Sequence, residues 1–234
     1  MSTFKFKHFS ILQERSTMKV GTDAMLLGSM VYAADPESIL DIGSGTGVLA
    51  LMMAQRFPKA QIEAVEVDEI AVEECRLNFD SSPWADRLTI YQEDILCFQE
   101  GEYDLIVSNP PYYQNTLENE DSRKARARHS AHLPPSHLLC KIAELLSEEG
   151  TAWLIVPRED SEQWMQRAND LGLHCKTHVG IFGKEVQDQA IRSILSFARQ
   201  NCEARHSQFI IRNSEGGYTN EYIELTKEFH HSEL

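Results

Sequence analysis

The stretch Asp41-Ile42-Gly43-Ser44-Gly45-Thr46-Gly47 decides the fold of this chain. It begins within a predicted strand at residues 38–42 and precedes a helical pattern at residues 48–56. A β-strand, a tight turn and an α-helix are therefore expected in succession. The three glycines allow the backbone to turn sharply and to approach a ligand with no Cβ in the way. A ligand-binding turn is predicted at the end of the first central strand.

Short β-rich runs alternate with longer helical runs outward from this turn. Helices are expected at residues 48–56, 69–79, 135–146 and 161–171. Strands are expected between them, at residues 38–42, 61–67, 87–92, 103–108 and 151–157, and three more follow at residues 174–182, 191–199 and 206–211. The alternation predicts an α/β fold with a single doubly wound, mostly parallel sheet. The late strands suggest an antiparallel hairpin closing one edge, and residues 1–35 are expected to be an N-terminal cap integral to the domain.

Composition limits the class of protein. At 234 residues and 42% apolar content, one domain is expected. The chain lacks the roughly 18 uninterrupted apolar residues of a membrane span, and its start lacks a secretory pattern, so a cytoplasmic location is expected. The five cysteines are scattered and never form a Cys-x-x-Cys pair. That usage is typical of a reducing compartment, and no metal spacing is seen.

Acidic residues accompany the glycine turn. Asp41 directly precedes it, and a dehydrogenase turn must hold a pyrophosphate that such a carboxylate would repel. A sulfonium cofactor with an amino-acid tail carries no phosphate and tolerates the carboxylate. Glu66 ends the second strand, where a carboxylate can accept both ribose hydroxyls. Asp94, after the third strand, is placed to meet an adenine amino group. Another kind of nucleotide-binding domain, or a cluster of helix caps, stays open at this point.

A second motif, Asn109-Pro110-Pro111-Tyr112, follows the strand at 103–108. Ligands of open α/β sheets bind outside the carboxyl ends of the strands, so this tetrapeptide is placed to reach the cofactor. An exocyclic amine is a poor nucleophile because its lone pair is delocalised. Two acceptors aimed at its hydrogens, the Asn109 side-chain oxygen and the Pro110 carbonyl, favour the localised geometry needed for attack. Tyr112 offers a face on which a base can stack.

These motifs resemble the Rossmann-like S-adenosylmethionine-dependent methyltransferase family. Asp41–Gly47 is similar to its first motif, Glu66 to its ribose-binding acid and Asp94 to its adenine-binding acid. The tetrapeptide resembles that of the amino methyltransferases, which act on adenine N6, guanine N2 or protein glutamine N5. Nearly the whole chain resembles the bacterial family that methylates N6 of adenine-37 in valine tRNA. This last resemblance is carried by Phe4–Gln13, Met18–Gly28, Asn109–Tyr113, Ala127–Ser130 and Tyr218–Phe229.

The resemblance implies a seven-stranded sheet with an antiparallel C-terminal hairpin, and a methyltransferase domain over residues 36–234. It also implies that Thr22 and Asp23 border the methionine end of the cofactor. The expected catalytic residues are Asn109, Pro110 and Tyr112. The expected cofactor-binding residues are Thr22, Asp23, Asp41, Gly43, Gly45, Gly47, Glu66, Asp94 and Asn109.

A small basic island lies on an otherwise acidic chain of net charge −14. It follows the tetrapeptide by about a dozen residues and consists of Arg123, Lys124, Arg126, Arg128 and His129. Such an island suits a compact nucleic-acid target and predicts a phosphate clamp beside the active site. A solvated loop paired with neighbouring carboxylates is the alternative.

We therefore expect an enzyme that transfers a methyl group from S-adenosylmethionine to adenine N6 in a tRNA anticodon loop, leaving S-adenosylhomocysteine. No membrane or metal partner is expected, and the oligomeric state is left open, with a slight preference for a monomer. Protein glutamine N5-methylation and ribosomal RNA guanine N2-methylation stay open as alternatives. For the first, Asp41 arrives too early to leave room for the helical domain that precedes the glycine motif in such enzymes. A cofactor-binding regulator without turnover is a third alternative.

Overall fold

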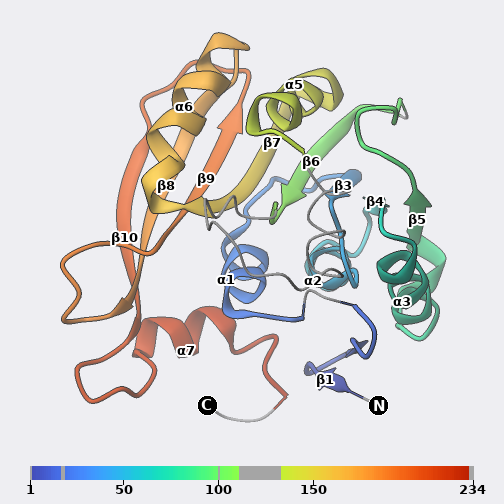
Figure 1. The fold of residues 1–234 in the computed structure, drawn as a ribbon, viewed down its shortest axis with the longest axis horizontal. Helices are drawn as coiled ribbons and strands as arrows, with labels where there is room; N and C mark the ends of the chain where they lie inside the picture. Colours follow the sequence, from blue (N-terminus) through green and yellow to red (C-terminus); the bar gives the residue numbers. More distant parts are fainter. Residues whose placement is uncertain (1, 17–18, 100, 111–132, 232–234) are drawn as a thin grey trace, which may run out of the picture.

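A central sheet of eight strands organises the computed structural model, which describes residues 2–16, 19–99, 101–110 and 133–231 (Figure 1). The strand order is β10-β8-β9-β7-β6-β3-β4-β5. All neighbours pair in parallel except β9, which is antiparallel to both β7 and β8. The bounds are β3 (Ser38–Ile42), β4 (Gln61–Glu66), β5 (Leu88–Gln92), β6 (Tyr103–Ser108), β7 (Leu146–Pro157), β8 (His174–Lys184), β9 (Arg192–Ala198) and β10 (Arg205–Arg212).

The predicted α/β class and mostly parallel sheet are confirmed, whereas the expected number of seven strands is wrong by one. All eight β-rich runs of the sequence form strands of the same sheet. The antiparallel hairpin is β8–β9, but it does not close the edge, because β10 pairs in parallel with the outer side of β8. An uncovered β8 would expose a row of unpaired backbone groups, and β10 satisfies them.

Within the described residues, six helices cover the two faces of the sheet unequally. One face carries α1 (Thr22–Met30), α2 (Val48–Arg56), α3 (Glu69–Asp80) and α7 (Asn220–Thr226), and the other carries α5 (Pro135–Leu145) and α6 (Ser161–Asp170). Two short 3₁₀ turns, η1 (Ala85–Arg87) and η2 (Arg158–Asp160), complete the described elements. Alternate strand residues face opposite sides, so Ile39 and Leu40 of β3 are both fully buried yet belong to different core clusters. None of the described helices combines the length and apolar character that a membrane crossing requires.

The N-terminal segment packs beside α2 and α3. It begins with a two-stranded hairpin, β1 (Thr3–Lys5) and β2 (Ser10–Leu12), and the rings of Phe6 and Phe9, in the segment between the strands, stack with centroids 4.3 Å apart. Phe6 also forms a β-bridge with His230, which joins the two ends of the chain. This packing supports our proposal that residues 1–35 are a cap integral to the domain.

Candidate active site

The glycine turn joins β3 to α2, as predicted. Gly43, Gly45 and Gly47 all have positive φ, at 69°, 55° and 82°. A Cβ added at Gly43 or Gly45 would meet nothing within 4 Å, so these two glycines leave open space in front of the turn. A Cβ at Gly47 would lie 2.6 Å from Cε1 of Phe79, so this glycine allows the turn to pack closely on α3. The first two glycines therefore face the open side of the turn, where they line a cavity, and the third packs against α3.

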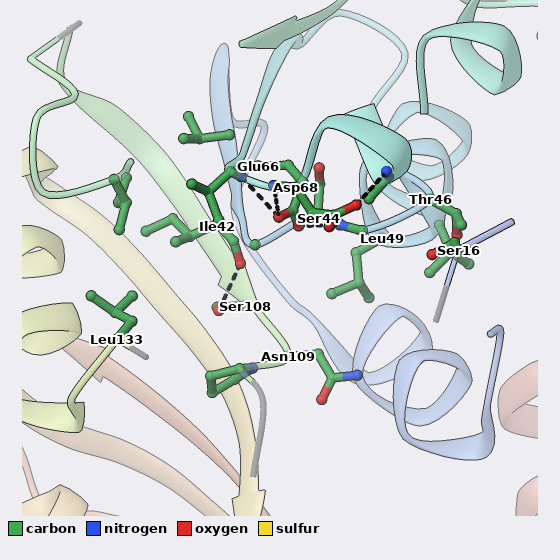
Figure 2. A pocket seen from close by; sticks show the side chains of 18 of the residues that line it. Ser16, Ile42, Ser44, Thr46, Leu49, Glu66, Asp68, Ser108, Asn109 and Leu133 are labelled. Atoms are coloured by element: carbon green, nitrogen blue, oxygen red, sulfur yellow. Dashed lines mark hydrogen bonds between the residues drawn. The ribbon is translucent and has the colours of Figure 1, made fainter. Parts of the chain in front are cut away.

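Glu66, at the end of β4, is held against the turn by three backbone amides. Its Oε2 accepts from the Gly45 amide at 2.9 Å, and its Oε1 accepts from the amides of Val67 at 2.8 Å and Asp68 at 2.9 Å (Figure 2). Hydrogen bonds of this charge-assisted kind orient a carboxylate strongly. The carboxylate is half-buried and lines a cavity in front of the turn, where sequence reasoning expects a ribose-binding acid.

Asp41 lies beneath the turn and is completely buried. Its Oδ2 accepts from the Ala50 amide at 3.0 Å, and its Oδ1 has no hydrogen-bond partner among the described residues. Burial raises the pKa of Asp41 to about 7; the Ala50 hydrogen bond opposes this shift and the charge of Glu66 adds to it. The structure thus places Asp41 behind the turn, not in the cavity wall where a directly cofactor-binding residue would lie.

The second motif reaches the same cavity because of strand register. Ile42 of β3 pairs with Ser108 of β6, so Gly43 and Asn109 leave adjacent parallel strands at the same edge of the sheet. Ser108 is 1% exposed and its hydroxyl donates to the Ile42 carbonyl at 2.8 Å, which ties the two strand ends together. Asn109 and the buried Pro110 follow and line the cavity (Figure 2).

The cavity measures about 260 Å³ and is open to solvent. Four carboxylates line it, those of Glu66, Asp68, Glu93 and Asp94. Asp94 is exposed, and its Oδ1 accepts from the Leu96 amide at 2.9 Å. Lys19 is the one cationic side chain among the described lining residues. Such a lining favours a ligand with positive charge and disfavours a pyrophosphate.

Several predicted site residues are absent from the described lining of the cavity, either because they lie elsewhere or because they fall outside the described residues. Thr22 and Asp23 begin α1 and are absent from the described lining of the cavity, and the Asp23 carboxylate pairs with Arg192 at 3.0 Å. Gly47, like Asp41, lies behind the turn. Tyr112 and the whole basic island fall outside the described residues; the island comprises Arg123, Lys124, Arg126, Arg128 and His129.

Two parts of the cavity wall were not predicted from the sequence. Ser16, Lys19 and Val20 form one part, from the N-terminal segment, and Leu133, just before α5, and Leu138, on α5, form the other. Lys19 and Val20 belong to the Met18–Gly28 stretch that carries the family resemblance, but only Thr22 and Asp23 were expected from it as site residues. The leucines are indistinguishable in the sequence from other core residues. Among the residues that the structure describes, no group of three or more His, Cys, Asp or Glu side chains could hold a metal ion.

Comparison with known proteins agrees with this geometry. Residues 15–166 match the family described as methyltransferase small domain. Two relatives are both named tRNA1(Val) (adenine(37)-N6)-methyltransferase. That of Vibrio campbellii is 40% identical and the alignment covers 97% of this chain and 95% of the relative. That of Flavobacterium psychrophilum is 41% identical over 97% of this chain and 98% of its own length.

Solved structures support the fold. A predicted O-methyltransferase from Agrobacterium tumefaciens superposes with a TM-score of 0.68 at 19% identity, covering 88% of this chain and 96% of its own. A methyltransferase from Pyrococcus furiosus does so with a TM-score of 0.58 at 22% identity, covering 82% and 90%. This chain therefore belongs to the family of the tRNA1(Val) (adenine(37)-N6)-methyltransferases, within the S-adenosylmethionine-dependent methyltransferases that share the small methyltransferase domain.

Proposed function

We propose that this chain transfers a methyl group from S-adenosylmethionine to N6 of an adenine in a tRNA anticodon loop, and that adenine-37 of tRNA1(Val) is its target. The observation that carries the proposal is the meeting of the glycine turn and Asn109-Pro110 in one cavity. Relatives that are about 40% identical over nearly the full chain bear the name of this reaction. Their names favour it over glutamine N5 and guanine N2 methylation.

The lining residues fit the cofactor. S-adenosylmethionine carries a sulfonium and an ammonium group against one carboxylate, so its net charge is positive and complements the four lining carboxylates. Gly43 and Gly45 would hold it against the turn, with Glu66 at the ribose and Asp94 at the adenine. We keep Thr22 and Asp23 as proposed neighbours of the methionine end. When bound, the cofactor supplies an electrophilic methyl group.

The residues of the second motif would present the amine. Asn109 would accept a hydrogen bond through its side-chain oxygen and Pro110 through its carbonyl, so that the nitrogen lone pair faces the methyl group. No strong general base is needed for this arrangement. We also propose that Tyr112 stacks on the base and that the island at residues 123–129 clamps phosphates, since an anticodon loop already presents unpaired bases.

The expected setting follows from the substrate. A tRNA-modifying enzyme works where tRNA is made and used, so we propose a cytoplasmic location and a tRNA partner. We further propose that the enzyme acts as a monomer and without a metal ion, because amine presentation and an activated methyl group need neither a second subunit nor a Lewis acid.

Two measurements test the proposal. In the first, labelled cofactor is incubated with the enzyme and with total RNA and total protein from a strain that lacks the gene, and the digested products are identified. Label in N6-methyladenosine supports the proposal, whereas label in methylglutamine or N2-methylguanosine contradicts it.

The second measurement uses a variant. Asn109→Ala should lower kcat by about 100-fold or more while binding of S-adenosylhomocysteine survives. Asn169→Ala, at an exposed position on α6, is the matched control. Unchanged turnover in Asn109→Ala would refute the role of that side chain.

A further inference from the structure

Two polar side chains on α3, Glu74 and Asn78, are buried and form their hydrogen bonds with other segments of the chain. Each is only 2% exposed, and they lie one helical turn apart on the same face. Burying a carboxylate costs much free energy unless hydrogen bonds compensate it, so such a residue calls for partners of matching strength.

The partners are backbone groups of the N-terminal segment. Oε1 of Glu74 accepts from the amides of Glu14 at 2.8 Å and Arg15 at 2.6 Å, and Oε2 accepts from the Ser16 amide at 3.0 Å. Asn78 binds Leu12 in both directions, accepting from its amide at 2.7 Å and donating to its carbonyl at 3.0 Å. Four residues of this short stretch, Leu12, Glu14, Arg15 and Ser16, are thus bound to α3 through their backbone groups.

The same part of the chain also supplies residues of the cavity wall. We call its described residues, 12–16 and 19–20, the strap. Ser16, Lys19 and Val20 line the cavity, and the Gln13 side chain accepts from the Val20 amide at 2.7 Å, which closes the strap on itself. In Figure 2, Ser16 and Leu133 lie at opposite ends of the cavity, so the strap forms a wall of its own.

Asn78 also connects the strap to the glycine turn. Its Nδ2 donates to the carbonyl of Thr46 at 2.9 Å as well as to that of Leu12. One buried amide therefore fixes the distance between the turn, which bears Gly43 and Gly45, and the strap, which bears Lys19. A shift of the strap would move the one cationic side chain that lines the described cavity.

We infer that Glu74 and Asn78 are positioning residues for cofactor binding, which hold the strap in register with the glycine turn. The inference rests on the proposed function only in taking this cavity as the S-adenosylmethionine site. The position of the strap relative to the turn matters because the strap carries Lys19, whose ammonium group suits the carboxylate of the cofactor.

The test is the binding of S-adenosylhomocysteine to the full chain, measured by calorimetry together with steady-state kinetics. In Glu74→Gln, Oε2 is replaced by an NH₂ group, which cannot accept the hydrogen bond from the Ser16 amide. We expect S-adenosylhomocysteine to bind about tenfold more weakly. The KM for S-adenosylmethionine should rise to the same extent, and kcat at saturating cofactor should stay close to that of the wild type. Asn78→Asp keeps the acceptor for Leu12 but loses both donations, so it should behave alike and serves if Glu74→Gln fails to fold.

Two controls separate positioning from general stability. Glu73→Gln alters the neighbouring glutamate, whose carboxylate binds the Arg15 side chain at 2.6 Å and not the strap backbone, so affinity should be unchanged. Ile142→Val creates a small cavity in the core beside α5 and lowers the melting temperature without touching the strap. Affinity losses in Glu74→Gln and Asn78→Asp no larger than in Ile142→Val would overturn the inference. A wild-type chain that binds no S-adenosylhomocysteine would instead overturn the proposed function beneath it.

Discussion

Asp41→Asn should remove the loss of folding stability that ionisation of the buried Asp41 carboxyl causes as the pH rises. The wild-type carboxyl is fully buried, and one of its oxygens has no hydrogen-bond partner among the described residues. Asparagine has nearly the same shape, and its Oδ1 can still accept from the Ala50 amide that Asp41 binds at 3.0 Å. The substitution therefore removes the cost of burying a charge and leaves the packing beneath the glycine turn largely intact.

The magnitude follows from the pKa of Asp41, which burial raises from 3.8 to about 7. Between these values the unfolded chain has ionised this carboxyl and the folded chain has not. Its stabilising contribution is thus complete below pH 3.8 and is lost as the pH rises to about 7. A shift of about three pKa units corresponds to about 4 kcal/mol, of which about 3 kcal/mol falls between about pH 4.5 and pH 8.

Urea unfolding of both proteins across this range, without cofactor, measures the effect. The free energy of unfolding of Asp41→Asn should rise relative to the wild type by about 3 kcal/mol between about pH 4.5 and pH 8. Taking the difference cancels the other titrating groups. Asp104→Asn is a control of opposite sign: burial acts to raise the pKa of Asp104, but hydrogen bonds from Glu37, Ser38 and Ser147 outweigh it and lower that pKa. Parallel pH profiles for the wild type and Asp41→Asn would refute the reasoning.

Three further outcomes are expected. Gly47→Ala should destabilise the fold more than Gly43→Ala, because both positions have positive φ but only at Gly47 would a Cβ meet α3, at 2.6 Å; urea unfolding of the two variants checks this. Gly28→Ala should be destabilising because its Cβ would lie 2.5 Å from the end of Met52, and Met52→Ala in the same chain should restore part of the loss in a double-mutant cycle. Cys75 should resist a maleimide until the chain unfolds, since burial, with the charge of Asp41 adding to it, raises its thiol pKa well above 9.0. The exposed thiols, which should react first in mass spectra of the native protein, are Cys97, Cys140 and Cys202.

The glycine turn and the Asn109 motif of the proposed site could be predicted from the sequence because each is local. The glycine turn and the Asn109 motif each follow a strand that is apolar enough to be recognised. Parallel strands then bring their carboxyl ends to one edge, and the pairing of Ile42 with Ser108 shows how close that brings the two motifs. The sequence pattern did not show which residues of the turn line the cavity. It did not separate Asp41 and Gly47, which lie behind the turn, from Gly43 and Gly45, which lie in front of it.

Elements without a clear periodicity were harder to predict. Helix α1 buries six consecutive residues, Ala24 to Ser29, so it lacks the alternation of apolar and polar faces that marks a surface helix. Helix α7 spans only seven residues and falls below the length at which such a pattern is recognisable. The eight β-rich runs were visible in the sequence, and the expectation of seven strands came from the family resemblance. At the β10 edge of the sheet, the local sequence pattern therefore predicted the number of strands better than the family resemblance did.

The strap illustrates a different limit. Glu73 and Glu74 are neighbours on a charged helix, and no feature of the sequence tells which of them is buried. Their difference arises from residues about 60 positions earlier, whose backbone meets Glu74 at distances of 2.6 to 3.0 Å. Because these partners are backbone amides, any residue other than proline could supply them, so they leave no sequence motif. This wall of the proposed cofactor site therefore depends on long-range backbone contacts. Substitutions of Glu74 or Asn78, which touch no ligand, should alter cofactor affinity, whereas those in the Asn109 motif should alter turnover.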